Sequence, residues 1–398
     1  MGEAVFSTTT RRRATGALGI GMARTHVSVA RTLIVLLVGL MAGRALAETT
    51  TERSASILIF PKIVYDGSRD TFIQISNTSN SMVHAHCFYV DATPQCIGTG
   101  DCLAGTCSGV CEPQWQEVDF SIWLTKQQPT HWSVSVGRIT NPADGLCDFG
   151  DPGHRIPPNY DCDGAGLDPG RIPPVSSFPF QGELRCIEVD QSGAPISGNH
   201  LKGEATIVST NGDSAKYNAV GILGEPFTNN GDNVLCLGGG VSDECPSGAE
   251  YQGCGQRVLL EHFAEGADDL IFGPTSSVET EVTLVPCRTD YERQEPTRVV
   301  VQFLAFNEFE TRLSTSTTID CWRSFFLSEV GGATFTVQNL ATRFALTTMR
   351  SSTMSNSGFV GIVEEYHHLG DDTTRAAFNL QEEGTREKTD LIFLPEGP

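Results

Sequence analysis

Hydrophobic and polar residues alternate most clearly within the stretch Ser56–Asn80. It opens with an apolar run, Ile57–Phe60, which is followed by the turn signal Asp66-Gly67-Ser68. Between Thr71 and Ser76, alternate residues suit a buried face, as in a strand with one side in solvent. The sequence Asn77-Thr78-Ser79-Asn80 then has the composition of a turn. The stretch therefore predicts two strands separated by a turn.

A weaker version of the same pattern returns downstream, at Glu281–Glu310. Phe60-Pro61 of the first stretch corresponds to Val285-Pro286 of the second. Further along, Trp132 corresponds to Trp322, so the landmarks keep their order while their spacing shortens. One fold used twice, with longer loops in the first copy, would produce this pattern. The alternative, two unrelated β domains that share turn chemistry, stays open.

These patterns predict an all-β fold of two tandem immunoglobulin-like β-sandwich units with long disulfide-stapled loops. The first unit spans residues 55–224 and carries a Cys-rich and a Pro/Asp-rich loop insertion. Residues 225–256 form a connector rich in Cys and Gly, and residues 257–398 form the second unit. The strand–turn–strand pattern with its Asn-Thr-Ser-Asn turn resembles the immunoglobulin-like modules of many secreted and surface proteins.

Residues 1–47 have the features of a signal peptide. Arginines at positions 11–13 precede the apolar run Leu33–Leu40, and Ala45-Leu46-Ala47 supplies the small residues of a cleavage site. The alternative is a membrane anchor, but the apolar core is shorter than the roughly 20 residues that a spanning helix needs. The sequence therefore predicts a mature chain without a membrane span, in an extracellular, periplasmic or cell-surface location.

The chain is acidic, with 27 Lys and Arg against 48 Asp and Glu. The leader carries six arginines and one glutamate, so its removal changes the net charge from −21 to −26. Such a charge repels nucleic acid and anionic membranes and permits cation binding. Solubility outside the cell explains it equally well.

Thirteen cysteines suit an oxidising compartment. Four of them, Cys96, Cys102, Cys107 and Cys111, lie within one short loop. Four thiolates can hold zinc, but the spacing lacks C-x-x-C pairs, so we expect two disulfides, with three pairings open. Elsewhere we expect disulfides between Cys87 and Cys186 and between Cys287 and Cys321, the latter inside the second unit.

The Pro/Asp-rich loop, residues 141–175, contains the best candidate metal site. Asp161, Asp163 and Asp168 are interspersed with glycines, so their carboxylates can converge on a hard cation such as calcium. The EF-hand pattern is not met, because Ile172 stands where its bidentate Glu should be. The alternative is a solvated turn held by Cys162.

Two further sets of side chains suggest a metal or catalytic site on strands. His84 and His86 share one face of a predicted strand. In the segment Glu364–His368, Glu364, Tyr366 and His368 alternate with Glu365 and His367. Paired polar residues on exposed strands are the alternative. No G-x-S-x-G, H-E-x-x-H, phosphate-loop or dinucleotide motif is present in the sequence.

Several phrases, among them FPKIVYDGSRDTFIQISNTSN, LTKQQPTHW and VQFLAFNEFE, resemble a family of uncharacterised exported bacterial β-rich proteins. The resemblance implies export and a β-rich fold, and it implies no cofactor or catalytic residue. We expect a secreted, non-enzymatic protein with a structural, adhesive or ligand-binding role. Its partner would be a surface polymer or a protein. The alternatives are a secreted hydrolase or metalloenzyme on a β scaffold, with His84, His86 or the Glu364–His368 segment in its site, and a calcium-dependent binding module.

Overall fold

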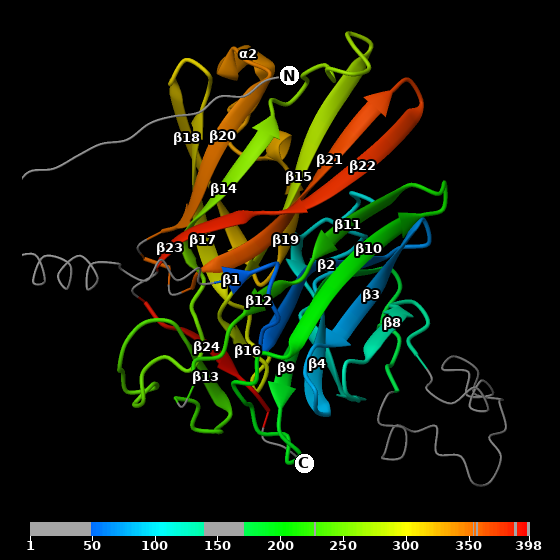
Figure 1. The fold of residues 1–398 in the computed structure, drawn as a ribbon. Coiled ribbons are helices and arrows are strands. Elements are labelled where there is room, and N and C mark those ends of the chain that lie inside the picture. Colours follow the sequence, from blue (N-terminus) through cyan, green and yellow to red (C-terminus); the bar gives the residue numbers. More distant parts are fainter. Residues whose placement is uncertain are drawn as a thin grey trace, which may run out of the picture. The chain divides into compact units, whose positions relative to one another are not determined.

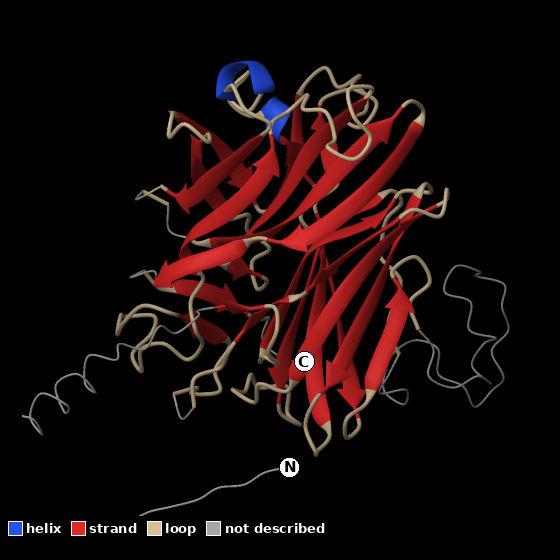
Figure 2. Cartoon of the chain, turned by 45° about the horizontal axis from the view of Figure 1, so that its top comes forward, coloured by secondary structure: helices blue, strands red, loops and turns tan. Residues whose placement is uncertain are grey.

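The computed structural model describes residues 49–395, except 139–170 and shorter gaps at 227, 353, 356 and 386–387. The predicted signal peptide and the predicted calcium ligands Asp161, Asp163 and Asp168 lie outside the described residues. Strands make up almost all of the regular structure (Figure 2). The all-β expectation is therefore confirmed. Helical turns occur at η2 (Leu327–Glu329) and α2 (Val337–Leu340).

Strands from the first half of the chain build two sheets (Figure 1). Sheet 1 has the order β1 (Thr49–Thr50), β12 (Val220–Ile222), β2 (Ile57–Tyr65), β9 (Phe180–Val189), β4 (Val83–Asp91) and β7 (Gln116–Leu124). Sheet 2 has the order β11 (Ser214–Asn218), β10 (Leu201–Ser209), β3 (Arg69–Asn77) and β8 (Pro129–Ser133).

Three further sheets are built mainly from the second half. Sheet 3 has the order β13 (Val234–Leu237), β24 (Asp390–Phe393) and β16 (Thr289–Asp290). Sheet 4 has the order β19 (Arg323–Phe326), β15 (Ser276–Pro286), β21 (Phe359–Leu369) and β22 (Asp372–Asn379). Sheet 5 has the order β18 (Arg312–Asp320), β17 (Arg298–Phe306), β20 (Phe344–Ser351), β14 (Gly255–Phe263) and β23 (Gln381–Thr385).

Alternate side chains of β2 enter two different hydrophobic cores. Leu58 and Phe60 pack in the cluster that joins sheets 1 and 2. Ile57 and Ile59 pack in a second cluster, which contains residues of sheets 3 and 4. A third cluster fills the space between sheets 4 and 5. Strand β2 of sheet 1 is therefore buried on both faces.

Two separate sandwiches would leave the outer face of each sheet to solvent, whereas both faces of β2 in sheet 1 are buried. Within the described residues, the five sheets of three or more strands are arranged as a five-blade β-propeller. The prediction of two tandem immunoglobulin-like β-sandwich units is therefore wrong. The predicted domain boundaries at 55–224, 225–256 and 257–398 stay a prediction.

The stretch Ser56–Asn80 does form two strands, but they do not pair with each other. β2 pairs with β9 and β12, whereas β3 pairs with β10 and β8. The turn between them is held by the Asp66 side chain, which accepts hydrogen bonds from the backbone N–H groups of Ser68 and Arg69. This turn carries the chain from sheet 1 to sheet 2.

Five disulfides occur among the described residues, and they fit a secreted or extracellular protein. The expected bridge between Cys87 and Cys186 is present. The expected bridge between Cys287 and Cys321 is wrong, because Cys287 pairs with Cys254 and Cys321 is a free, buried thiol. Cys236 pairs with Cys245.

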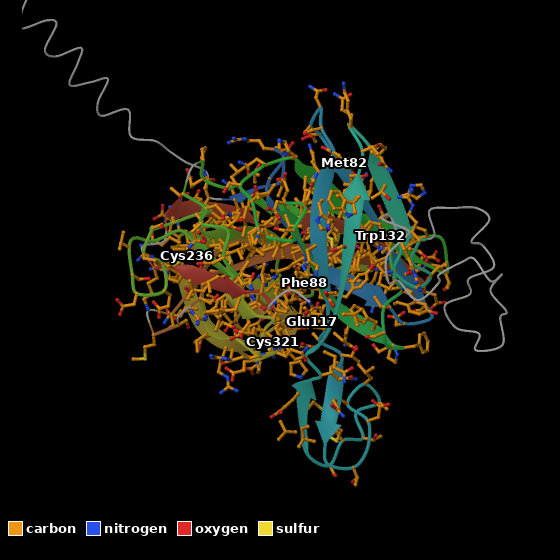
Figure 3. All side chains as sticks on the ribbon, turned by 90° about the horizontal axis from the view of Figure 1, so that it is seen from below. Met82, Phe88, Glu117, Trp132, Cys236 and Cys321 are labelled. Atoms are coloured by element: carbon orange, nitrogen blue, oxygen red, sulfur yellow. A yellow bond between two sulfur atoms is a disulfide. The ribbon has the colours of Figure 1, made fainter. Side chains whose placement is uncertain are left out.

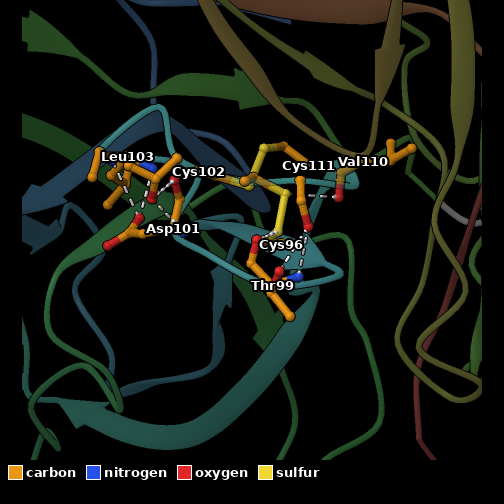
Figure 4. Close-up of a disulfide and its surroundings, with 11 residues drawn as sticks. Cys96, Thr99, Asp101, Cys102, Leu103, Val110 and Cys111 are labelled. Carbon is orange, nitrogen blue, oxygen red and sulfur yellow. Dashed lines mark hydrogen bonds between the residues drawn. A yellow bond between two sulfur atoms is a disulfide. The ribbon is translucent and has the colours of Figure 1, made fainter.

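The Cys-rich loop forms a small hairpin of β5 (Pro94–Ile97) and β6 (Val110–Pro113), which projects from the sheets in Figure 3. Disulfides Cys96–Cys107 and Cys102–Cys111 staple it. Figure 4 shows Cys96, Cys102 and Cys111 in this hairpin. The disulfide interpretation of this loop is therefore confirmed, and the pairing is now fixed. No helix in the described part of the chain is long and apolar enough to cross a membrane.

Candidate functional site

An open pocket with a cavity volume of about 660 Å³ lies on sheet 5. Its size falls in the range of about 300–1,000 Å³ that is typical of small-molecule sites. Strands β14, β17, β20, β21 and β22 supply most of the lining. The lining residues are Glu261, His262, Phe263, Phe306, Asn307, Glu308, Phe344, Ala345, Leu346, Glu365 and Phe378. We call this site the aromatic pocket.

Strand register places the apolar lining side by side. Phe263 on β14 is directly opposite Phe344 on β20, and their ring centroids are 4.5 Å apart. Two residues further along β20, Leu346 lies between Glu261 on one side and Phe306 of β17 on the other. Because side chains two apart on a strand share a face, these five line one surface of sheet 5.

This apolar surface is open to solvent. Phe344 is 37% exposed and Leu346 is 38% exposed, although both belong to strands. The inward residues between them behave as core: Ala345 packs in the cluster between sheets 4 and 5. A large apolar side chain on the outer face of a sheet loses the stabilisation that burial would give it. An exposed aromatic surface of this kind is typical of a ligand or partner site.

The second wall of the pocket comes from sheet 4. Strand β23 pairs with β14 only from Gly255 to Leu259, so it does not extend to Phe263. Glu365 of β21 and Phe378 of β22 contribute to the lining beyond that point. The pocket therefore forms where two sheets meet.

His262 supplies an uncharged polar group to the lining. Its Nδ1–H donates to the backbone oxygen of Phe263 at 2.7 Å, and its Nε2 accepts from the Thr347 hydroxyl at 2.8 Å. Burial lowers the pKa of His262 to about 4, against the opposing effect of the hydrogen bond to Phe263. The imidazole is therefore neutral at neutral pH.

Behind the Glu365 wall lies a histidine held between carboxylates. His367 Nδ1 is 2.5 Å from Asp269 Oδ2, and its Nε2 is 3.7 Å from Glu365 Oε2. Burial raises the pKa of Glu365, although the charge of His367 opposes this shift. Catalytic histidines of hydrolases contact a nucleophile on one nitrogen and a carboxylate on the other. His367 instead contacts a carboxylate on each side.

The residues of Glu364–His368 divide between the two faces of β21, as the alternation predicts. Glu365 and His367 face the pocket side. On the opposite face, Tyr366 donates to Glu281 at 2.6 Å and His368 contacts Thr373 and Glu279. These side chains form no single constellation.

His84 and His86 lie on β4 of sheet 1. His84 stacks on Trp123, with ring centroids 4.1 Å apart, and donates from Nδ1 to the backbone oxygen of Asp190. His86 contacts the Asp119 carboxylate at 2.8 Å. Within the described residues, neither histidine shares a contact partner with the Glu364–His368 segment. The structure does not bring the two sets together.

A buried ionic network links the two halves of the chain. Lys62 on β2 contacts Glu281 on β15 at 2.7 Å and also contacts Glu364 on β21. Arg375 on β22 extends the network from Glu364 to Asp213, at 3.4 Å and 2.8 Å. Burial alone would raise the pKa of Glu281, but the Lys62 ammonium and its hydrogen bond lower it to about 2. The network is filled by its own side chains, which points to a structural role.

Two groups of possible metal ligands occur in the described part of the chain: Cys96, Cys102 and Cys107, and Cys254, Cys287 and Asp390. All of their cysteines are in disulfides, which removes the thiolates that a metal would need.

The aromatic pocket was not predicted from the sequence. The sequence did contain one signal for it. Around Phe263, Phe306 and Phe344, side chains alternate between the two faces of a strand, and each ring lies on the face that points away from the core.

No protein-family model and no curated protein matches the chain. Among solved structures, the apo form of the Pleurotus ostreatus lectin is similar at 11% identity, covering 82% of this chain and 76% of that chain, with a TM-score of 0.13. The C-terminal domain of the Streptococcus pyogenes antigen I/II-family protein AspA is similar at 8% identity, covering 85% and 100%, with a TM-score of 0.13. Neither likeness bears on fold or function at these scores.

Proposed function

We propose that the protein is an exported, non-enzymatic ligand-binding protein and that the aromatic pocket holds its ligand. The observation that carries this proposal is the open cavity of about 660 Å³ walled by phenylalanines, of which Phe344 is 37% exposed. A sheet surface without function would place polar residues at the positions of Phe344 and Leu346. The five described disulfides support export to an extracellular, periplasmic or cell-surface location. We also propose that the chain belongs with the exported bacterial β-rich family that its sequence resembles.

The contacts of the polar groups favour binding over hydrolysis. His262 uses both ring nitrogens in hydrogen bonds within sheet 5, and His367 uses both to contact carboxylates. Neither is therefore placed to activate a nucleophile at the pocket. The phenylalanine rings supply apolar contact area, and the carboxylates supply orientation.

The test uses the mature chain and an uncharged solvatochromic dye, Nile red. A pocket variant, Phe344→Ser with Leu346→Ser, removes two exposed apolar side chains from the lining. The matched control is Phe72→Ser with Met82→Ser, since these residues are 45% and 56% exposed and lie outside the pocket. Urea unfolding confirms that both variants fold.

We expect the pocket variant to bind the dye about tenfold more weakly than the natural chain, since two large apolar contacts are lost. We expect the control variant to bind it like the natural chain. Equal dye affinity in the two variants would show that the aromatic pocket is not the binding site.

A further inference from the structure

The charged groups of the aromatic pocket are all acidic. Its lining contains three carboxylates, on Glu261, Glu308 and Glu365, and no Lys or Arg among the described residues. His262, the one imidazole of the described lining, is neutral because it is buried. An anionic ligand would meet repulsion from these groups and would find no counter-ion in the described lining.

One aromatic ring of the pocket already has a cation against it. The Arg312 guanidinium lies 5.6 Å from the centroid of the Phe306 ring. This distance is within the range at which a cation is attracted to the face of an aromatic ring. Arg312 is on β18, across the β17–β18 ladder, and it is not part of the lining. The Phe306 ring is therefore already in contact with one cation from outside the lining.

Glu365 offers a carboxylate at the wall of the pocket, and its ion pair with His367 is long. It is largely shielded from solvent, with its side chain 14% exposed, and its ion partner His367 is 3.7 Å away. A nearby cation stabilises such a carboxylate more than water does in a partly buried site. The opposite wall carries Phe263 and Phe344, which can pack on the apolar part of the same ligand.

We propose that the ligand of the aromatic pocket is a small organic cation, whose apolar body packs on the phenylalanines and whose ammonium group faces the carboxylates. This inference rests on the proposed binding function of the same pocket. The net charge of −21 adds a long-range attraction for cations and speeds their encounter with the protein.

The test compares three probes with one apolar body: phenylbutyl trimethylammonium, its uncharged analogue with carbon in place of nitrogen, and phenylbutane sulfonate. Each probe competes with Nile red for the natural chain at low salt. We expect the ammonium probe to bind about tenfold more tightly than the uncharged analogue. We expect the sulfonate to bind most weakly of the three.

Variants that remove a charge show which residues cause the preference for the ammonium probe. Glu308→Gln and Glu365→Gln should each weaken the ammonium probe by about threefold to tenfold and weaken the uncharged probe clearly less. Arg312→Met should strengthen the ammonium probe, because it removes a competing cation from Phe306. The matched control, Glu292→Gln, changes an exposed carboxylate outside the pocket and should alter nothing.

The outcomes separate this inference from the binding function. Equal affinities for the ammonium and uncharged probes, or tightest binding of the sulfonate, would overturn cation selectivity while the pocket remained a binding site. An ammonium preference that persists unchanged in both Gln variants would overturn the role of these carboxylates. Failure of the Phe344 and Leu346 variant to weaken Nile red would overturn the binding function itself.

Discussion

The Lys62 ammonium lies 2.7 Å from the Glu281 carboxylate, although 219 residues separate the two in the chain. Lys62 is 2% exposed, and its second partner, Glu364, is 1% exposed. Burial disfavours a charged lysine, but the Glu364 and Glu281 carboxylates raise the pKa of Lys62 above its ordinary value. The pairing joins β2 of the first half to β15 and β21 of the second.

Removing the ammonium should therefore destabilise the fold strongly. We expect Lys62→Met to lower the free energy of unfolding by about 3–5 kcal/mol, because two carboxylates lose a buried counter-ion. Urea unfolding measures this change. The exposed pair Arg257–Glu383 provides the control, and Arg257→Ala should cost about 1 kcal/mol or less. Similar losses in the two variants would contradict the structural role of Lys62.

Because of Glu117, we expect the free energy of unfolding to fall as the pH rises. Burial and the nearby Asp119 charge raise its pKa from 4.5 to about 8, and its buried Oε2 has no hydrogen-bond partner in the described structure. Glu117, labelled in Figure 3, lies on β7 opposite Val90 of β4. The folded protein holds this proton more tightly than the unfolded chain does. The contribution to stability is therefore fully present below pH 4.5 and is lost as the pH rises to about 8.

Glu117→Gln should remove this pH dependence, because the amide does not ionise. Urea unfolding at pH of about 5 and of about 8.5 should show a smaller loss in the variant than in the natural chain. Glu112→Gln is the matched control, since Glu112 is exposed on the hairpin strand β6. An unchanged pH dependence in Glu117→Gln would show that another group carries the effect.

The disulfides should differ in what they contribute to stability. Cys87–Cys186 closes a loop between residues 99 positions apart and lies in the core of sheet 1, whereas Cys96–Cys107 joins residues 11 positions apart. Loop entropy predicts about 4–5 kcal/mol for the first bridge and about 3 kcal/mol for the second. Paired Cys→Ala variants, compared by urea unfolding, check this order. A larger loss from the hairpin bridge would contradict it.

The sequence pattern identified strands well and their partners poorly. Alternation between Thr71 and Ser76 predicted β3, and the apolar run at Ile57 predicted β2. The turn Asp66-Gly67-Ser68 looks the same whether it closes a hairpin or carries the chain to another sheet. Local turn chemistry therefore favoured the incorrect immunoglobulin-like arrangement.

The other features that the sequence did not predict depend on contacts between residues far apart in the chain. Nothing in the neighbourhood of Lys62 reveals Glu281, and nothing near Cys287 favours Cys254 over Cys321, because folding alone brings these residues together. The aromatic pocket, too, is formed by residues that only folding brings together. Phe263, Phe306 and Phe344 are unremarkable strand residues one at a time, and only the register of β14, β17 and β20 places them on one surface.

Photoaffinity labelling shows where on the protein an apolar ligand binds. An uncharged phenylbutyl probe that carries a diazirine is bound to the mature chain, activated by light, and located by peptide mapping. The account predicts label concentrated on Phe263, Phe306, Phe344 and Leu346, and loss of that label when excess phenylbutyl trimethylammonium competes. Label spread over other exposed apolar residues, such as Phe72, Val241 and Met354, without such competition would contradict it.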